Sequence, residues 1–171
     1  MKTKDLTTAS LLLAMGMVLH ALTPAILGGV KPDFLLAMMF IAILIRPIPS
    51  HTFVVSIAAG VIAALTTSFP GGQLPSLIDK LGSGFFVLLV EMVLLRQNRK
   101  FLPLAVLGFS ATFVSGVLFL GSAALIVGLP APMGALMTGV VLPTAIANSL
   151  VCGIVAQVLR STRVMKPQPT N

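Results

Sequence analysis

Charged residues, cysteine, tryptophan and tyrosine are scarce or absent in this sequence. Only 9% of its 171 residues are charged, against roughly a quarter in soluble domains, so an ordinary water-facing surface is excluded. The single cysteine, Cys152, excludes a disulfide-stapled secreted domain. Disorder is excluded because 57% of the residues are hydrophobic. The net charge of +7 would suit nucleic acid, but the mean hydropathy of +1.08 and the few aromatic residues do not. These absences leave an integral membrane protein.

Hydrophobic runs separated by charges, proline and glycine predict six membrane-spanning helices in one domain, residues 1–171. Lipid admits only helices or closed barrels, and the runs lack the alternation of barrel strands, so we expect an all-α bundle. The charge-free stretch Phe101–Leu159 is too long for one span, and the cluster Gly128–Pro132 divides it. The predicted spans are Leu6–Leu22, Phe34–Ile45, Phe53–Phe69, Leu81–Leu95 (with a first turn starting near Ser76), Leu104–Val127 and Met133–Leu159.

The second run, Phe34–Ile45, is short for a span, which needs about 20 residues. We therefore expect its helix to extend back through Lys31, Pro32 and Asp33, since proline is tolerated in a first turn. Lys31 and Asp33 would then lie near membrane depth and face protein or water rather than lipid.

Basic residues lie mostly on one side of the predicted bundle. Six spans place both termini on the same side, and the positive-inside rule makes the more basic side cytoplasmic. We therefore expect both termini in the cytoplasm. The outer side holds only Lys31 and Lys80. The inner side holds Lys2, Lys4, Arg46, Arg96, Arg99, Lys100, Arg160, Arg163 and Lys166.

Catalytic and energy-coupling motifs are absent from the sequence. It has no phosphate-binding loop, so we do not expect the chain itself to hydrolyse ATP. It has no metal-binding or paired-cysteine motif, so no metal or cofactor is expected. Gly108-Phe109-Ser110 resembles a serine nucleophile turn, but no histidine follows His51 to act as its base. The sequence does not indicate an enzyme.

The polar residues on the predicted outer side are the candidates for a binding site. Lys31 and Asp33 fall in the first outer loop or at the start of the second span, and Gln73, Asp79 and Lys80 fall in the second outer loop. Each loop carries one charge of each sign. A lysine suits a carboxylate and an aspartate suits an ammonium, so the pairs fit a zwitterion. The two pairs could equally neutralise each other, and the residues alone leave both interpretations open.

Two further polar residues fall inside predicted spans. His20 lies toward the outer end of the first, and Asn148 lies within the sixth. Polar groups in hydrocarbon are costly, so we expect both side chains to face the bundle interior or a cavity. For Asn148, an interhelical hydrogen bond is the commoner role.

Small residues four apart mark faces where helices can pack closely. We expect most of these faces to pack within the chain. The face on the first span, Ser10 and Ala14, is the candidate for an external partner. The other faces are Ser56, Gly60 and Ala64 in the third span and Ala145, Ser149 and Gly153 in the sixth.

Several segments closely resemble the bacterial tryptophan transport protein family, over essentially the whole chain. The outer-loop segments are specific motifs and not merely hydrophobic runs. The segments are Met1–Lys4, Gly29–Asp33, Ala64–Pro75, Ile78–Lys80 and Leu125–Pro130.

That family in turn resembles the substrate-binding S components of energy-coupling factor transporters, which are small six-helix proteins. The resemblance implies tryptophan as the substrate, and a shared transmembrane T protein and two cytoplasmic ATPases as partners. It implies that Ser10 and Ala14 contact the T protein. Tryptophan's ammonium and carboxylate would meet the outer charges, while Gly71 and Gly72 would allow its close approach to the backbone. Since the chain has no tryptophan or tyrosine, phenylalanine, methionine and aliphatic groups must line any indole site.

Three alternatives remain open at this point. One is a stand-alone amino-acid carrier driven by an ion gradient, although we find no repeat and no acid in the middle of a predicted span. A second is a membrane scaffold that binds no ligand. A third is an S component for a vitamin-like substrate, because one fold can accept many ligands.

Overall fold

Six helical segments make up the part of the chain that the structure describes. The structure is a computed structural model that describes residues 3–26, 29–95 and 100–161. The segments are α1 (Thr3–Leu22), α2 (Leu35–Ile45), α3 (Pro49–Thr66), α4 (Gln73–Val90) continued by the π-helical η1 (Glu91–Leu95), α5 (Phe101–Ile126), and a last segment formed by α6 (Met133–Leu136), the π-helical η2 (Met137–Val141) and α7 (Leu142–Ser161).

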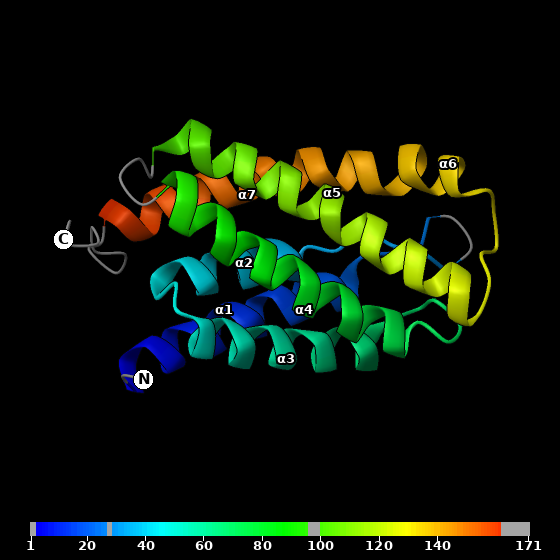
Figure 1. The fold of residues 1–171 in the computed structure, drawn as a ribbon, viewed down its shortest axis with the longest axis horizontal. Helices are drawn as coiled ribbons and strands as arrows, with labels where there is room; N and C mark the ends of the chain where they lie inside the picture. Colours follow the sequence, from blue (N-terminus) through cyan, green and yellow to red (C-terminus); the bar gives the residue numbers. More distant parts are fainter. Residues whose placement is uncertain (1–2, 27–28, 96–99, 162–171) are drawn as a thin grey trace.

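The segments run back and forth along the long axis of the molecule (Figure 1). The first and last described residues, Thr3 and Ser161, lie at the same end, which we call the terminal end. The other end, which we call the distal end, holds the connections α1–α2, α3–α4 and α5–α6. Along the bundle α5 packs on α7, α4 lies between α3 and α5, and α1 packs on α2.

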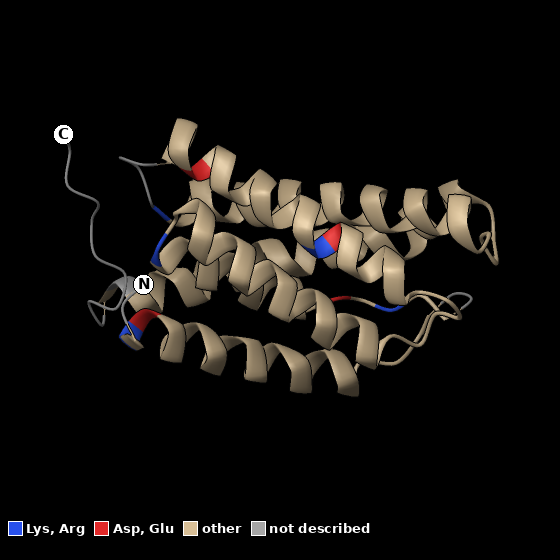
Figure 2. Ribbon diagram, turned by 60° about the horizontal axis from the view of Figure 1, so that its bottom comes forward, with Lys and Arg blue, Asp and Glu red and all other residues tan. Residues whose placement is uncertain are grey.

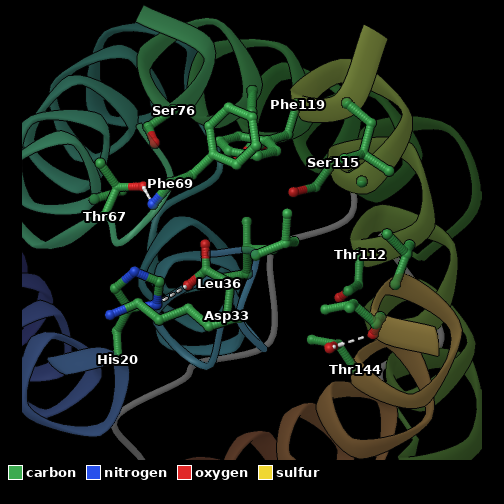
Figure 3. Close-up of a pocket in the computed structure, with 18 of the residues that line it drawn as sticks. His20, Asp33, Leu36, Thr67, Phe69, Ser76, Thr112, Ser115, Phe119 and Thr144 are labelled. Carbon is green, nitrogen blue, oxygen red and sulfur yellow. Dashed lines mark hydrogen bonds and ion pairs between the residues drawn. The ribbon is translucent and has the colours of Figure 1, made fainter. Parts of the chain in front are cut away.

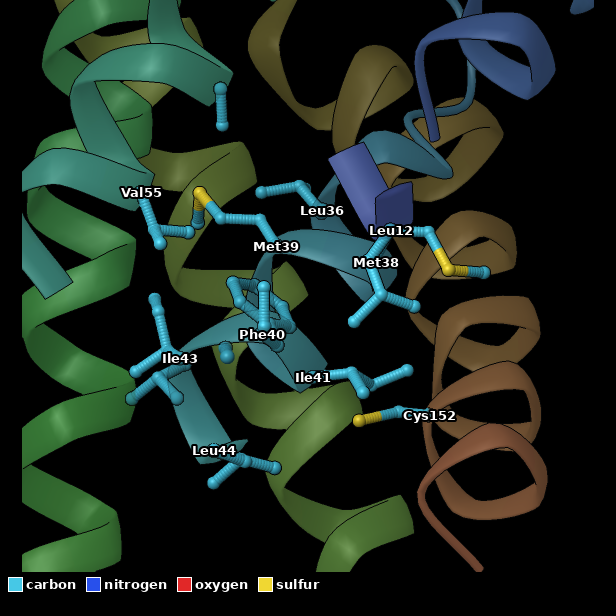
Figure 4. Packing of buried hydrophobic residues seen from close by; sticks show 14 of the residues in the cluster. Leu12, Leu36, Met38, Met39, Phe40, Ile41, Ile43, Leu44, Val55 and Cys152 are labelled. Carbon is cyan, nitrogen blue, oxygen red and sulfur yellow. The ribbon is translucent and has the colours of Figure 1, made fainter. Parts of the chain in front are cut away.

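Helix α2 is the centre of the bundle. Its residues from Leu35 to Leu44 are each no more than 2% exposed. The helix contacts α1, α3, α4, α5 and α7, and the side chains of Leu12, Val55 and Cys152 close around it (Figure 4). A helix that is apolar on every side has no face to offer water, so it is buried. The predicted second span therefore exists and ends at Ile45 as expected.

The peripheral helices carry large exposed apolar side chains, as a lipid-facing surface requires. Leu11 on α1, Leu65 on α3 and Leu125 on α5 are 63%, 81% and 90% exposed. Among the residues that the structure describes, four helices are long and apolar enough to cross a membrane: α1, α3, α5 and the last segment. α2 is a shorter apolar helix. The predicted runs thus all form helices, and four of them satisfy the length and composition of a span.

The expected extension of the second span back through Lys31, Pro32 and Asp33 is wrong. α2 begins at Leu35, and Lys31, Pro32 and Asp33 lie in a non-helical segment before it. The residue before a proline is disfavoured in the helical region, which keeps Lys31 out of the helix. Gly29 adopts a φ of +84°, so the chain is already turning when it reaches this segment.

The predicted loop position of Asp79 and Lys80 is also wrong. α4 begins at Gln73, so both residues lie on its second turn. Gly71, at a φ of +73°, turns the chain immediately before the helix. Pro75 falls in the first turn, where its missing N–H costs no hydrogen bond. The helical position turns both side chains inward.

Charged residues gather at the terminal end and at one place between the helices toward the distal end (Figure 2). At the terminal end Arg46 Nη1 lies 3.0 Å from Asp5 Oδ2 and ties the end of α2 to α1. Several of the basic residues on which the predicted orientation depends lie outside the described residues. They are Lys2, Arg96, Arg99, Arg163, Lys166 and the side chain of Arg160.

The small-residue faces of α3 and α7 pack inside the chain, as expected. A methyl group on Gly60 would come within 2.7 Å of Leu77 on α4, and one on Gly153 within 2.7 Å of Phe101 on α5. The hydroxyl of Ser149 donates a 2.8 Å hydrogen bond to a carbonyl of α5.

Candidate functional site: a charged cavity near the distal end

A cavity lies between the helices toward the distal end and is partly open to solvent (Figure 3). It encloses about 610 Å³ of space free of atoms, counting the part open to solvent. Its lining residues are His20, Gly29, Val30, Lys31, Asp33, Leu36, Ala63, Thr67, Phe69, Ser76, Asp79, Lys80, Thr112, Ser115, Gly116, Phe119, Leu120, Val140, Val141 and Thr144.

The inner part of the cavity holds a cluster of three charged side chains. Lys80 Nζ lies 2.6 Å from Asp33 Oδ2 and 2.5 Å from Asp79 Oδ2. The side chains of Lys80 and Asp79 are 2% and 3% exposed, and that of Asp33 is 16% exposed. A buried ammonium is tolerated only when it is paired, and here one ammonium serves two carboxylates. Counted as formal charges, Lys80, Asp33 and Asp79 together carry one more negative than positive charge.

His20 extends the cluster to α1. Its Nδ1 lies 3.1 Å from Asp33 Oδ1 (Figure 3). The segment before α2 therefore receives one contact from α1 and one from α4, both on the carboxylate of Asp33. This carboxylate joins three parts of the chain that are distant in sequence.

Lys31 is placed apart from this cluster, in the segment between α1 and α2. Its Nζ donates a 2.9 Å hydrogen bond to the carbonyl oxygen of Thr66, the last residue of α3. Carbonyls at a helix C-terminus lack intrahelical partners and attract cations. Partial burial lowers the pKa of Lys31, and the nearby Asp33 opposes that change. Lys31 is thus a cation held by a neutral acceptor.

The apolar side of the cavity contains two aromatic rings. Phe69, which follows α3, and Phe119 on α5 meet edge to face, with centroids 5.6 Å apart and planes at 76°. Such edge-to-face pairs are favourable beyond the area they bury. Leu36, Leu120 and Val140 line the cavity as well. This side supplies an apolar surface of the kind that an aromatic ligand needs.

The π-helical segment η2 brings Val140 and Val141 to the cavity. Pro143 follows it after one residue, Leu142. A proline inside a helix cannot donate a hydrogen bond and clashes with the carbonyl four residues earlier, here Gly139. The wider π turn accommodates that clash and shifts the register of the residues that face the cavity.

Asn148 lies behind the cavity wall rather than on it. Its amide donates to the backbone carbonyl of Asp33 at 2.9 Å and to Thr112 Oγ1 at 3.2 Å. The bond to Thr112 on α5 is the interhelical hydrogen bond anticipated for it, and the bond to Asp33 fixes the segment before α2. Asn148 is therefore a positioning residue in this structure.

Five of the predicted site residues line this one cavity: His20, Lys31, Asp33, Asp79 and Lys80. The contact between Lys80 and Asp33 shows that charges from the two predicted loops do pair with each other, which was one of the two interpretations left open.

Three other predicted site residues do not line the cavity. A methyl group on Gly71 would come within 2.4 Å of Val127 Cγ1, so this glycine allows the α3–α4 turn to pack on the end of α5. Gly72 immediately precedes α4 and is packed against Thr67 and Phe69. Gln73 is exposed at the start of α4. These residues shape the turn that leads into α4.

The sequence reasoning missed the cavity residues of the charge-free stretch. Thr112, Ser115 and Phe119 follow one another on α5 at intervals of three and four, the spacing of one helix face. Thr144 and Asn148 share a face of α7 in the same way. Polar residues at helical spacing in an otherwise apolar span were the available signal.

On α1 the small residues Ser10 and Ala14 are both exposed, on the outside of the bundle. They take no part in the core that Ala9, Leu12 and Leu13 of the same helix form.

Comparison with known proteins gives a consistent picture. The family model described as "Tryptophan transporter TrpP" matches residues 2–163. Proteins named "Probable tryptophan transport protein" are similar over nearly their whole length. The one from Bacillus subtilis is 44% identical, covering 97% of this chain and 98% of the relative. The one from Clostridium acetobutylicum is 42% identical, covering 96% and 97%.

A third relative of the same name, from Clostridium perfringens, is 37% identical over 87% of each chain. No solved structure matches the chain. A family match over nearly all residues, together with several long apolar helices, leads to one conclusion: the chain belongs to the tryptophan transporter family and is a multi-pass membrane protein.

Proposed function

We propose that this protein takes up tryptophan, which it binds from outside the cell in the cavity near its distal end. The observation that carries the proposal is the arrangement of the cavity. A buried cluster of opposite charges, Lys80 with Asp33 and Asp79, lies beside a wall containing Phe69 and Phe119. An amino acid with an aromatic side chain presents both a zwitterion and an apolar ring, and the cavity offers a surface for each. The names of the family and of the relatives support tryptophan as the substrate.

The proposed orientation places both termini in the cytoplasm of a bacterial cell, with the distal end facing outward. Two observations support it. Thr3 and Ser161 lie at the same end of the bundle, and the described basic residues Lys4, Arg46 and Lys100 belong to the predicted cytoplasmic side. The cavity would then receive substrate from outside.

The proposed energy source is external to the chain. The sequence has no phosphate-binding loop, so we propose that the protein is the substrate-binding subunit of an energy-coupling factor transporter. A transmembrane T component and two cytoplasmic ATPases would be its partners. The exposed small residues Ser10 and Ala14 on α1 would allow close approach of another helix.

One observation favours a second candidate, a stand-alone carrier coupled to an ion gradient. Asp79 is buried on the second turn of α4 and not in a loop. Buried acidic residues in a bundle mark ion and proton paths in carriers. The sequence argument against this alternative, that no acid lies in the middle of a predicted span, is therefore weakened.

The absence of tryptophan and tyrosine from the chain makes a direct binding test simple. Tryptophan is titrated with the purified, folded protein, and the ligand's own emission is recorded. Binding in an apolar cavity should shift the emission to shorter wavelength in a saturable way. A folded protein that produces no saturable shift would refute tryptophan as the ligand and reopen the vitamin-like alternative.

The energy source needs a separate measurement. Uptake of radiolabelled tryptophan is compared in cells and vesicles that do or do not contain the T component and ATPases. Uptake that requires them supports the subunit proposal. Uptake by the chain alone in an ion gradient supports the stand-alone carrier.

A further inference from the structure

The charges of the cavity are not evenly distributed. The inner cluster contains two carboxylates, Asp33 and Asp79, and one ammonium, Lys80. The other cation that lines the cavity, Lys31, is held separately at the end of α3. The inner cluster therefore has an excess of negative charge, and the compensating positive charge lies at Lys31.

Lys80 is a poor place for a ligand's carboxylate. Its ammonium is already shared by two carboxylates at 2.5 and 2.6 Å. A third carboxylate would bring like charges together in a site where water screens them little. The inner cluster therefore repels an anion.

The same cluster is suited to a ligand's ammonium. The Ser115 hydroxyl lies beside the Asp79 carboxylate, but Asp79 Oδ1 is buried and accepts no hydrogen bond of ordinary geometry. Its partner oxygen Oδ2 is occupied by Lys80, so Oδ1 is the acceptor that remains. A second ammonium would balance the charge of the cluster and satisfy a buried acceptor, whose unpaired state is costly.

Lys31 is suited to the other end of a zwitterion. The hydrogen bond that holds its Nζ is to the neutral carbonyl of Thr66. A ligand carboxylate would gain an ion pair there. Because this side chain is only partly buried, the pair is worth much less than one formed inside.

We propose that the ligand binds with its ammonium inward against Asp79 and its carboxylate outward toward Lys31. The ammonium is then the essential group, and the carboxylate is secondary. The site accepts primary amines with an indole ring and rejects indole acids that lack the amine. This inference rests on the proposed function, because it concerns how the same cavity holds its ligand.

The test compares three ligands that share the indole and therefore the fluorescence signal: tryptophan, tryptamine and indole-3-propionate. The titrations are made at a pH of about 8, where an ordinary histidine is neutral. Tryptamine should bind within about fivefold of tryptophan, because it loses only a partly exposed ion pair. Indole-3-propionate should bind at least about thirtyfold more weakly, because it leaves the inner carboxylate unpaired and adds an anion.

A pair of variants checks the outward position of the carboxylate. Lys31→Met should lower the affinity for tryptophan to about the affinity for tryptamine. It should leave the affinity for tryptamine unchanged or slightly higher. Lys100→Met, at the exposed start of α5 near the terminal end, is the matched control and should change neither. The wild-type ligand series needs no variant, so it remains decisive if a variant fails to fold.

The outcomes separate the two proposals. Saturable binding of tryptophan with indole-3-propionate as tight as tryptamine, or tighter, overturns the orientation and leaves the proposed function standing. An equal loss of tryptophan and tryptamine binding in Lys31→Met also overturns it. Failure of wild-type protein to bind tryptophan overturns both.

Discussion

Lys80 Nζ and Asp33 Oδ2 lie 2.6 Å apart and join α4 to the segment that leads into α2. Because α2 is enclosed by the other helices, this ion pair ties the outer part of the bundle to its centre. The same pair forms a wall of the cavity. Loss of the ion pair between Lys80 and Asp33 would therefore affect both the stability of the protein and the shape of the site.

Asp33→Asn should lower the free energy of unfolding by about 2 kcal/mol, because the buried Lys80 ammonium loses one of its two charged hydrogen-bond partners while remaining paired with Asp79. Melting in detergent, followed by circular dichroism, measures the change. The control is Asp5→Asn, which removes the more exposed pair with Arg46 and should cost less than about 1 kcal/mol. Equal losses in the two variants would contradict a structural role for the buried pair.

Gly116→Ala should both destabilise the protein and reduce tryptophan affinity. A methyl group there would lie 2.3 Å from Val141 Cγ1, so α5 must move away from η2 beside the cavity. Gly121→Ala on the same helix meets no heavy atom within 4 Å. It should be neutral or slightly stabilising, since alanine is the better helix former. Parallel melting and fluorescence titrations of the two variants provide the comparison, and indistinguishable behaviour would argue against this contact.

Phe119→Leu should weaken tryptophan binding by about two- to tenfold, because it removes one ring of the aromatic pair with Phe69. Phe109→Leu is the matched control, since Phe109 lies on the same helix but is exposed on the outside. Its dissociation constant should equal that of wild type. A loss of binding in Phe109→Leu as large as in Phe119→Leu would show that the effect is not local to the cavity.

The membrane orientation can be read from cysteine labelling, because the native Cys152 is buried against α2. We expect an impermeant maleimide to label Gln73→Cys in intact cells but to label Thr3→Cys only after the membrane is opened. Both positions are exposed, at the distal and terminal ends respectively. Wild-type protein, which should stay unlabelled, is the background control. Labelling of Thr3→Cys alone in intact cells would reverse the proposed orientation.

Sequence patterns predicted the end of a helix correctly where an apolar run is followed by a strong stop signal. The first predicted span ends at Leu22 and the second at Ile45, as α1 and α2 do. At Ile45 the following residues Arg46 and Pro47 stop the run in any context. Hydropathy failed where a helix begins with polar residues. Hydropathy alone did not predict the start of α4 at Gln73, because Pro75, Asp79 and Lys80 lower the hydrophobicity of its first turns.

The candidate site was predictable in its residue types but not in its contacts. Of the seven charged or polar residues identified, five line one cavity, while Gln73 and Asn148 do not. The glycines of the α3–α4 turn were misjudged, because a glycine that allows close packing looks the same in sequence whether a ligand or a side chain approaches it. Here Val127 is the neighbour of Gly71.

By itself the sequence determined the class of protein and the order of its helices. Scarce charge and long apolar runs are properties of the chain alone, and they dictate a lipid environment. Only the tertiary structure decided that Lys80 pairs with Asp33 and that Phe69 meets Phe119. Those contacts join residues far apart in the chain, and their geometry arises from helices packing around the buried α2. Local patterns carry no information about which side chains that packing brings together.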